Sequence, residues 1–75
     1  MMSLMYTVLV RDLRDRERLC AFFRDVRVCV LGTEGNRIEV KVPQSVSPLH
    51  AKRELSGYVI TWNALNPGAY AELVH

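Results

Sequence analysis

Long apolar runs are missing from this sequence of 75 residues. The longest mainly apolar stretches, such as residues 4–10, have the length of a strand, whereas a helix that crosses a bilayer needs about 18 consecutive apolar residues. The first residues also lack the basic segment and the following apolar segment of a secretory signal. We therefore expect no membrane association and a cytoplasmic location.

Cysteine is scarce, and neither sign of charge dominates. Two cysteines, Cys20 and Cys29, are too few for the disulfide framework of a secreted miniprotein, so we expect free thiols. Ten lysines and arginines against eight aspartates and glutamates leave a net charge of only +2. This excess is far below the basic stripe that drives binding to a phosphate backbone, so nucleic acid is permitted as a partner but not implied.

Linkers, repeats and low-complexity segments are also absent, so we expect residues 1–75 to form a single domain. A domain of this size buries only about 60% of the surface that its unfolded chain exposes. Its own core therefore stabilises it only marginally, and self-association would add to its stability. The small size is thus a first reason to expect a homo-oligomer.

The residues that are present follow two clear periodicities. Residues 37–42 alternate charged and apolar side chains, which predicts a strand with one buried face. Leu19, Phe23 and Val26 recur at the spacing of a helix that buries one side. Applied along the whole chain, these patterns predict four strands and two helices. The predicted strands are 5–10, 27–31, 37–42 and 69–74, and the predicted helices are about 12–25 and 48–65.

Capping and turn residues mark where these elements begin and end. Asp12 is the predicted N-cap of the first helix, and a serine followed by Pro48 marks the start of the second. Residues 32–36 contain two glycines and an asparagine, which predicts the turn of a β-hairpin. The order of elements is therefore β, α, β, β, α, β.

This order predicts an α+β fold of the ferredoxin-like class. With right-handed crossovers, a βαββαβ chain forms a four-stranded antiparallel sheet with both helices on one face and with strands 5–10 and 37–42 in the centre. The buried stripe predicted for the second helix includes Tyr58 and Leu65. The side chains expected to be buried in the core are Phe23, Val40, Leu55, Val59 and Trp62.

The second face of the predicted sheet has no helix to cover it. Its expected residues are about half apolar, and charges of opposite sign alternate along residues 37–41. Such a face suits a protein partner or a second copy of the chain related by a two-fold axis. We therefore expect a non-catalytic interaction or regulatory module that forms a homodimer through this face. The expected interface residues are Met5, Leu9, Cys29, Leu31, Arg37, Glu39, Lys41 and Tyr70.

A nucleic-acid-binding accessory domain is the alternative function. Its phosphate contacts would be Arg11, Arg27, Arg37 and Lys41. The stretch 11–27 is rich in arginine, but it also contains four acids, several of which fall at the spacing of ion pairs on one helix. The expected pairs include Asp12 with Arg16, Asp15 with Arg18 and Arg14 with Glu17. The third predicted strand also lacks the aromatic side chains that stack on bases in sheet-type RNA-binding modules.

Residues with catalytic or metal-binding chemistry are few and scattered. No two of the cysteines and histidines have the spacing of a metal-ligand pair. His50 and Glu54 stand four residues apart on the second predicted helix, where such a pair is most often a surface ion pair. The glycines of the predicted turn flank Glu34, whose charge would repel a phosphate. We therefore expect no catalytic residues, no metal and no cofactor.

Overall fold

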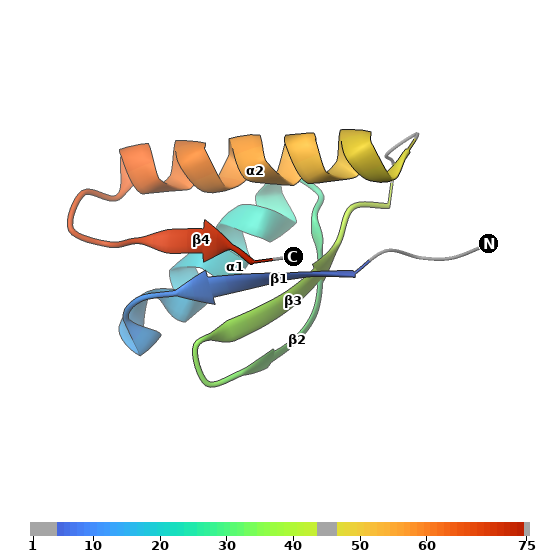
Figure 1. The fold of residues 1–75 in the computed structure, drawn as a ribbon. Coiled ribbons are helices and arrows are strands. Elements are labelled where there is room, and N and C mark those ends of the chain that lie inside the picture. Colours follow the sequence, from blue (N-terminus) through green and yellow to red (C-terminus); the bar gives the residue numbers. More distant parts are fainter. Residues whose placement is uncertain (1–4, 44–46, 75) are drawn as a thin grey trace.

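The computed structural model, which describes residues 5–43 and 47–74, shows an α+β fold with a four-stranded antiparallel sheet and two α-helices (Figure 1). The elements follow one another in the predicted order. They are strand β1 (Met5–Val10), 3-10 helix η1 (Leu13–Asp15), helix α1 (Arg16–Asp25), strands β2 (Cys29–Glu34) and β3 (Arg37–Lys41), helix α2 (Pro48–Leu65) and strand β4 (Ala71–Leu73). No helix in the described part of the chain is long and apolar enough to cross a membrane.

The strands lie side by side in the order β2-β3-β1-β4, and all three neighbouring pairs are antiparallel. The prediction that β1 and β3 occupy the centre is therefore confirmed. Thr7 lies opposite Glu39 in the pairing of β1 with β3. Leu9 lies opposite Glu72 in the pairing of β1 with β4. These registers determine which side chains meet on each face of the sheet.

One face of the sheet forms the core together with both helices. Along β1 and β3 the buried side chains alternate with more exposed ones, as the sequence pattern predicted. The two helices add their own buried residues to the same cluster, so they cover the same face of the sheet; α1 lies behind the sheet in Figure 1. The buried residues of this cluster include Tyr6, Val8, Val10, Leu19, Phe23, Ile38, Val40, Ala51, Leu55, Val59 and Trp62.

All five predicted core residues are buried, which confirms that part of the prediction. The inclusion of Leu65 was wrong, because its side chain is 67% exposed. At 100° per residue the buried stripe continues from Trp62 to Asn66, so Leu65, the last residue of α2, is rotated off it. Tyr58 is half-buried against the core, and its hydroxyl donates a hydrogen bond to Oε2 of Glu54 at 3.1 Å.

The helix starts follow their capping residues. The Oγ of Ser47 accepts a hydrogen bond from the backbone N–H of His50 at 3.1 Å, and Pro48 occupies the first turn, so α2 begins and ends where the sequence predicted. The first predicted helix is divided instead. Asp12 accepts from the N–H of Arg14 and caps η1, so α1 begins only at Arg16.

The hairpin between β2 and β3 differs from the prediction. Gly32 lies inside β2, next to a β-bulge, and the turn consists of Gly35 and Asn36 alone. Gly35 has a φ of 57°, which suits the first central position of a two-residue hairpin turn. The Asn36 amide donates to the carbonyls of Val10 at 2.7 Å and Arg11 at 3.1 Å. These contacts with the end of β1 stabilise the tight turn. The glycines in the sequence did not predict them.

The beginning of β2 was also predicted too early. Arg27 has a φ of 67°, which belongs to the left-handed region and not to a strand. The N–H of Val28 donates to the carbonyl of Phe23 at 2.8 Å, and the N–H of Arg27 donates to that of Arg24 at 3.1 Å. This is the Schellman arrangement that closes a helix, so residues 26–28 end α1 and β2 begins at Cys29.

Candidate interaction surface

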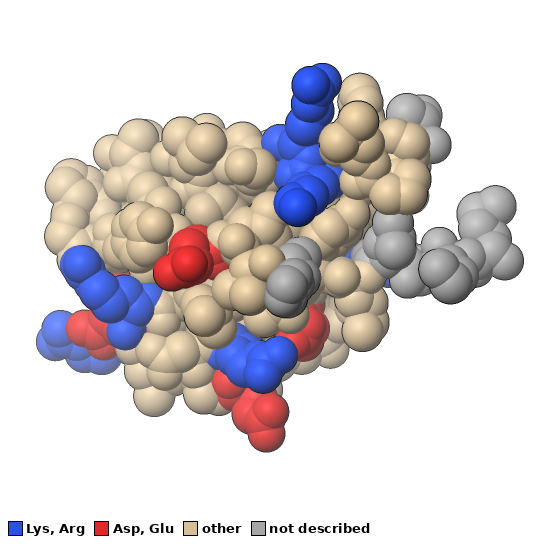
Figure 2. Space-filling model, viewed as in Figure 1, with Lys and Arg blue, Asp and Glu red and all other residues tan. Residues whose placement is uncertain are grey.

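The face of the sheet opposite the helices is the candidate interaction surface, and we call it the open face. Figure 2 shows this side of the molecule, with α2 along the top: acidic and basic side chains are interspersed among uncharged ones, and no large region of one sign is visible in this view. Strand registers and the alternation of side chains define its residues. They are Met5, Thr7 and Leu9 on β1, Arg37, Glu39 and Lys41 on β3, Cys29, Gly32 and Glu34 on β2, and Glu72 on β4.

Six of the eight predicted interface residues belong to the open face by register. Leu31, which is exposed, lies at the bulge of β2, between the paired residues Val30 and Gly32. Tyr70 lies one residue before β4, but its carbonyl accepts from the N–H of Arg11 at 2.8 Å, which extends the pairing with β1. The N–H of Val74 donates to the carbonyl of Thr7, also at 2.8 Å. The ladder therefore continues beyond both ends of β4.

The centre of the open face holds a carboxylate whose charge is compensated within the chain. The Thr7 hydroxyl donates to the Glu39 carboxylate, with Oγ1 lying 3.0 Å from Oε1 and 2.9 Å from Oε2. Nη2 of Arg37 lies 3.6 Å from Oε1 of the same carboxylate. Prediction of the interface residues omitted Thr7, although alternation along β1 places it on this face. Glu39 therefore presents less unbalanced charge than its position in the sequence suggests.

Exposed apolar side chains surround this centre. Met5 at one end of β1 is 60% exposed, whereas Leu9 near the other end is half-buried. Tyr70 and Val74 are exposed on either side of β4. Val74 was also omitted from the prediction, although it shares the alternation of Tyr70 and Glu72. The open face thus combines apolar area with charges of both signs.

The edge of the sheet at β4 is closed by a side chain of α2. The amide of Asn63 donates from Nδ2 to the carbonyl of Ala71 at 2.9 Å, and its Oδ1 accepts from the N–H of Ala71 at 2.8 Å. Because the flanking residues bond to β1, these groups of Ala71 point away from the sheet. At the opposite edge, β2 carries a bulge, a feature that disfavours pairing with a further strand.

The basic side chains do not form one patch. Nη2 of Arg11 donates to the carbonyl of Gly68 at 2.7 Å, at the turn between α2 and β4. Arg37 is next to Glu39, as described above. Arg27 lies at the end of α1, and Lys41 lies on the open face at the far end of β3.

The arginines before and in α1 are partly neutralised by acids, as expected. Arg18 lies 3.8 Å from Asp15, which confirms that predicted pair. The predicted pairing of Asp12 with Arg16 was wrong. The extra turn η1 brings Arg14 back to Asp12 at 2.8 Å, and this hydrogen bond holds the pKa of the Asp12 carboxyl below its usual value. Arg16 instead donates to the carbonyl of Gly35 at 2.9 Å.

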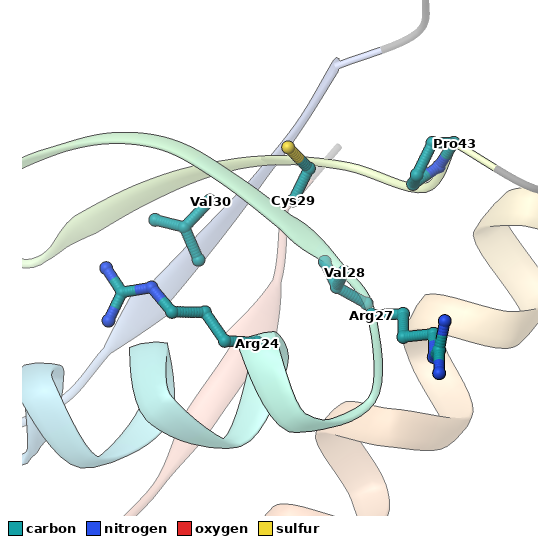
Figure 3. Close-up of a pocket in the computed structure, with 6 residues that line it drawn as sticks. All are labelled: Arg24, Arg27, Val28, Cys29, Val30 and Pro43. Carbon is teal, nitrogen blue, oxygen red and sulfur yellow. The ribbon is translucent and has the colours of Figure 1, made fainter.

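A hollow of about 380 Å³ lies at the end of α1, and Figure 3 shows the residues that line it. The side chains of Arg24 and Arg27 point to opposite sides, and the Cys29 sulfur points away from both. The hollow is also wide open, so it brings no set of polar groups onto one ligand. It therefore lacks the convergent geometry of a small-molecule site.

The described residues hold no group of three or more potential metal ligands. Cys20 is buried in the core, and the loss of water raises the pKa of its thiol, whereas Cys29 is exposed. The Glu54 carboxylate accepts from Tyr58, and the expected ion pair with His50 is not formed among the residues described.

Comparisons of the chain with protein-family models, with curated proteins and with solved structures found no match.

Proposed function

We propose that this protein is a non-catalytic interaction module with a ferredoxin-like fold that associates with a second copy of itself through the open face. The strand order β2-β3-β1-β4 supports the fold, because two interleaved right-handed β-α-β units place β1 and β3 in the centre and leave both helices on one face. The proposal retains the cytoplasmic location expected from the sequence.

The observation that carries the proposal is the character of the open face. It offers exposed apolar side chains, while its central acid, Glu39, is bonded by Thr7 and Arg37 of the same chain. Covering a charge that already has partners costs less free energy than covering an unpaired charge, and removing apolar area from water favours association. The open face can therefore be covered without leaving its central charge unpaired.

The closed edges also support association through the face. A sheet with a free edge can pair with a further strand, but Asn63 occupies the edge at Ala71, and the bulge interrupts the edge at β2. The outer side of α2 has less continuous apolar surface, because its exposed apolar residues Leu49 and Ile60 are separated by Arg53 and Gly57.

Sedimentation over a series of concentrations tests this function. We expect the weight-average mass to rise from monomer to dimer, and Leu9→Glu to weaken the dimer at least roughly tenfold. Ile60→Glu is the matched control, since it places the same charge on an exposed apolar residue of α2. A chain that stays monomeric at high concentration would refute the proposal. A dimer broken by Ile60→Glu but not by Leu9→Glu would refute it as well.

The alternative function as a nucleic-acid accessory domain has weaker support. Two of its four predicted phosphate contacts are occupied within the chain, Arg11 by the Gly68 carbonyl and Arg37 by Glu39. Phosphate binding weakens steeply between about 50 and about 200 mM salt, whereas apolar self-association does not. An electrophoretic shift that disappears over this range would favour the alternative.

A further inference from the structure

We propose that the two copies are related by a two-fold axis that runs along β1, with Leu9 close to the axis. This inference rests on the proposed self-association through the open face. It specifies which side chains meet across the interface, and it follows from one row of residues in the sheet.

The row has an acid and a base on opposite sides of an apolar residue. Leu9 lies opposite Glu72 on one side of β1 and opposite Arg37 on the other side. All three side chains belong to the open face, because residues directly opposite one another in an antiparallel sheet point to the same side. Across the sheet, the row is therefore Glu72, Leu9, Arg37.

A two-fold rotation about β1 exchanges the two sides of this row. Glu72 of one copy then faces Arg37 of the other copy, and the symmetry repeats the pair. Leu9 meets its own counterpart at the axis, and Met5, further along the same strand, lies close to the axis too. Packed sheets differ by about 30° in strand direction, which leaves residues near the axis in contact.

Two other positions of an axis parallel to the strands bring like charges together. An axis along β3 places Arg37, Glu39 and Lys41 against their own counterparts. An axis between β1 and β3 exchanges the outer strands and places Glu72 against Glu34, which is paired with Arg37 at the end of the hairpin. Like charges that face each other across an interface are unfavourable. The distribution of charge therefore favours the axis along β1 over these two positions.

Both members of the proposed pair have the capacity to bind. The side chain of Glu72 is exposed and makes no hydrogen bond or ion pair with other described residues. Arg37 is also exposed, and its approach to Glu39 at 3.6 Å involves only Nη2. A guanidinium group has five N–H donors, so Arg37 can bind a partner carboxylate while it remains beside Glu39.

Charge reversal tests the axis. In Glu72→Arg two arginines face each other across the interface, and in Arg37→Glu two glutamates do, so each variant alone is expected to dimerise at least roughly tenfold more weakly than the parent chain. In an equimolar mixture, each of the two pairs of a mixed dimer joins an arginine of one variant to a glutamate of the other.

The two pairs of such a mixed dimer can be followed one at a time. In one pair, position 72 of the Glu72→Arg copy faces the glutamate that Arg37→Glu introduces in the other copy, so the opposite charges are restored with their places exchanged. In the other pair, the unchanged Arg37 of the first copy faces the unchanged Glu72 of the second, as in the parent dimer. Sedimentation of the mixture should therefore recover the dimer that neither variant forms alone.

The control is Glu17→Arg, a matched reversal at an exposed position of α1, which should leave the dimer unchanged. Circular dichroism checks that each variant is folded, and recovery in the mixture excludes unfolding as the cause of the loss. If single reversals have no effect while Leu9→Glu still breaks the dimer, the axis is wrong and the proposed function stands. A mixture that fails to recover also overturns the axis, and a parent chain that never dimerises overturns both.

Discussion

The side chain of Asn63 binds both backbone groups of Ala71, donating to the carbonyl at 2.9 Å and accepting from the N–H at 2.8 Å. A single amide on α2 therefore takes the place that a fifth strand would occupy beside β4. It links the helix layer to the short strand, and it removes the two groups that would begin a further pairing.

We predict that Asn63→Ala destabilises the fold by about 1–3 kcal/mol, because two partly buried backbone groups lose their partner. Asn63→Asp is a matched control: its carboxylate still accepts from the Ala71 N–H, but it cannot donate to the carbonyl. Urea denaturation should place it between the parent and the alanine variant. Equal stability of all three proteins would show that the hydrogen bonds between Asn63 and Ala71 do not stabilise the fold.

Replacement of Arg27 by glycine should stabilise the protein. Arg27 has a φ of 67° at the end of α1, where a residue with a Cβ is disfavoured by about 1 kcal/mol and glycine is the usual residue. Arg27→Ala shortens the side chain but keeps the Cβ, so it separates the backbone effect from the loss of the guanidinium. We expect a higher urea midpoint for glycine than for alanine, and an alanine variant at least as stable as the glycine variant would contradict this.

Truncation of Trp62 should remove most of the stability. The side chain is 1% exposed and is the largest in the core, so Trp62→Ala is expected to cost about 3–5 kcal/mol. Domains of this size have little stability in reserve, and the variant should be largely unfolded by circular dichroism. Tyr70→Ala is the control on an exposed ring and should stay folded. A Trp62→Ala protein with unchanged melting would show that α2 packs through another face.

Stability should fall at alkaline pH through the buried thiol. Burial raises the pKa of Cys20 above its ordinary value of about 9, so the folded state holds its proton after the unfolded state has released it. The stability that this difference in pKa contributes is fully present below the ordinary pKa of the thiol, and it is lost as pH rises above that value. We expect the urea midpoint to decrease less between about pH 8 and about pH 10.5 in Cys20→Ala than in the parent chain. Equal decreases of the urea midpoint in both proteins would show that Cys20 does not cause the loss of stability.

Local patterns were sufficient to predict most of the elements. Alternation along residues 37–42 predicted β3 because one side of that strand is buried and the other is wet. Ser47 and Pro48 predicted the start of α2, since capping depends on neighbours in the chain. Arg27 was assigned to a strand because a left-handed arginine has no signature in the sequence, and Gly32 was assigned to the turn because a bulge has none.

The candidate surface was predictable in outline only. Alternation along each strand indicates which residues share a face, but register is needed to know that Glu72 and Arg37 flank Leu9. The bonds from Thr7 to Glu39 and from Asn63 to Ala71 depend on elements meeting in space. Such contacts join residues of different helices and strands, so the spacing of residues along the chain does not predict them.

The most direct test of self-association through the open face is the mass of the parent chain and of Leu9→Glu, measured by sedimentation equilibrium over the same series of concentrations. We expect the parent chain to approach twice its monomer mass of 8.6 kDa, while Leu9→Glu stays near the monomer mass. A parent chain that remains at 8.6 kDa at the highest concentration, or a Leu9→Glu protein that dimerises as well as the parent, would contradict this expectation.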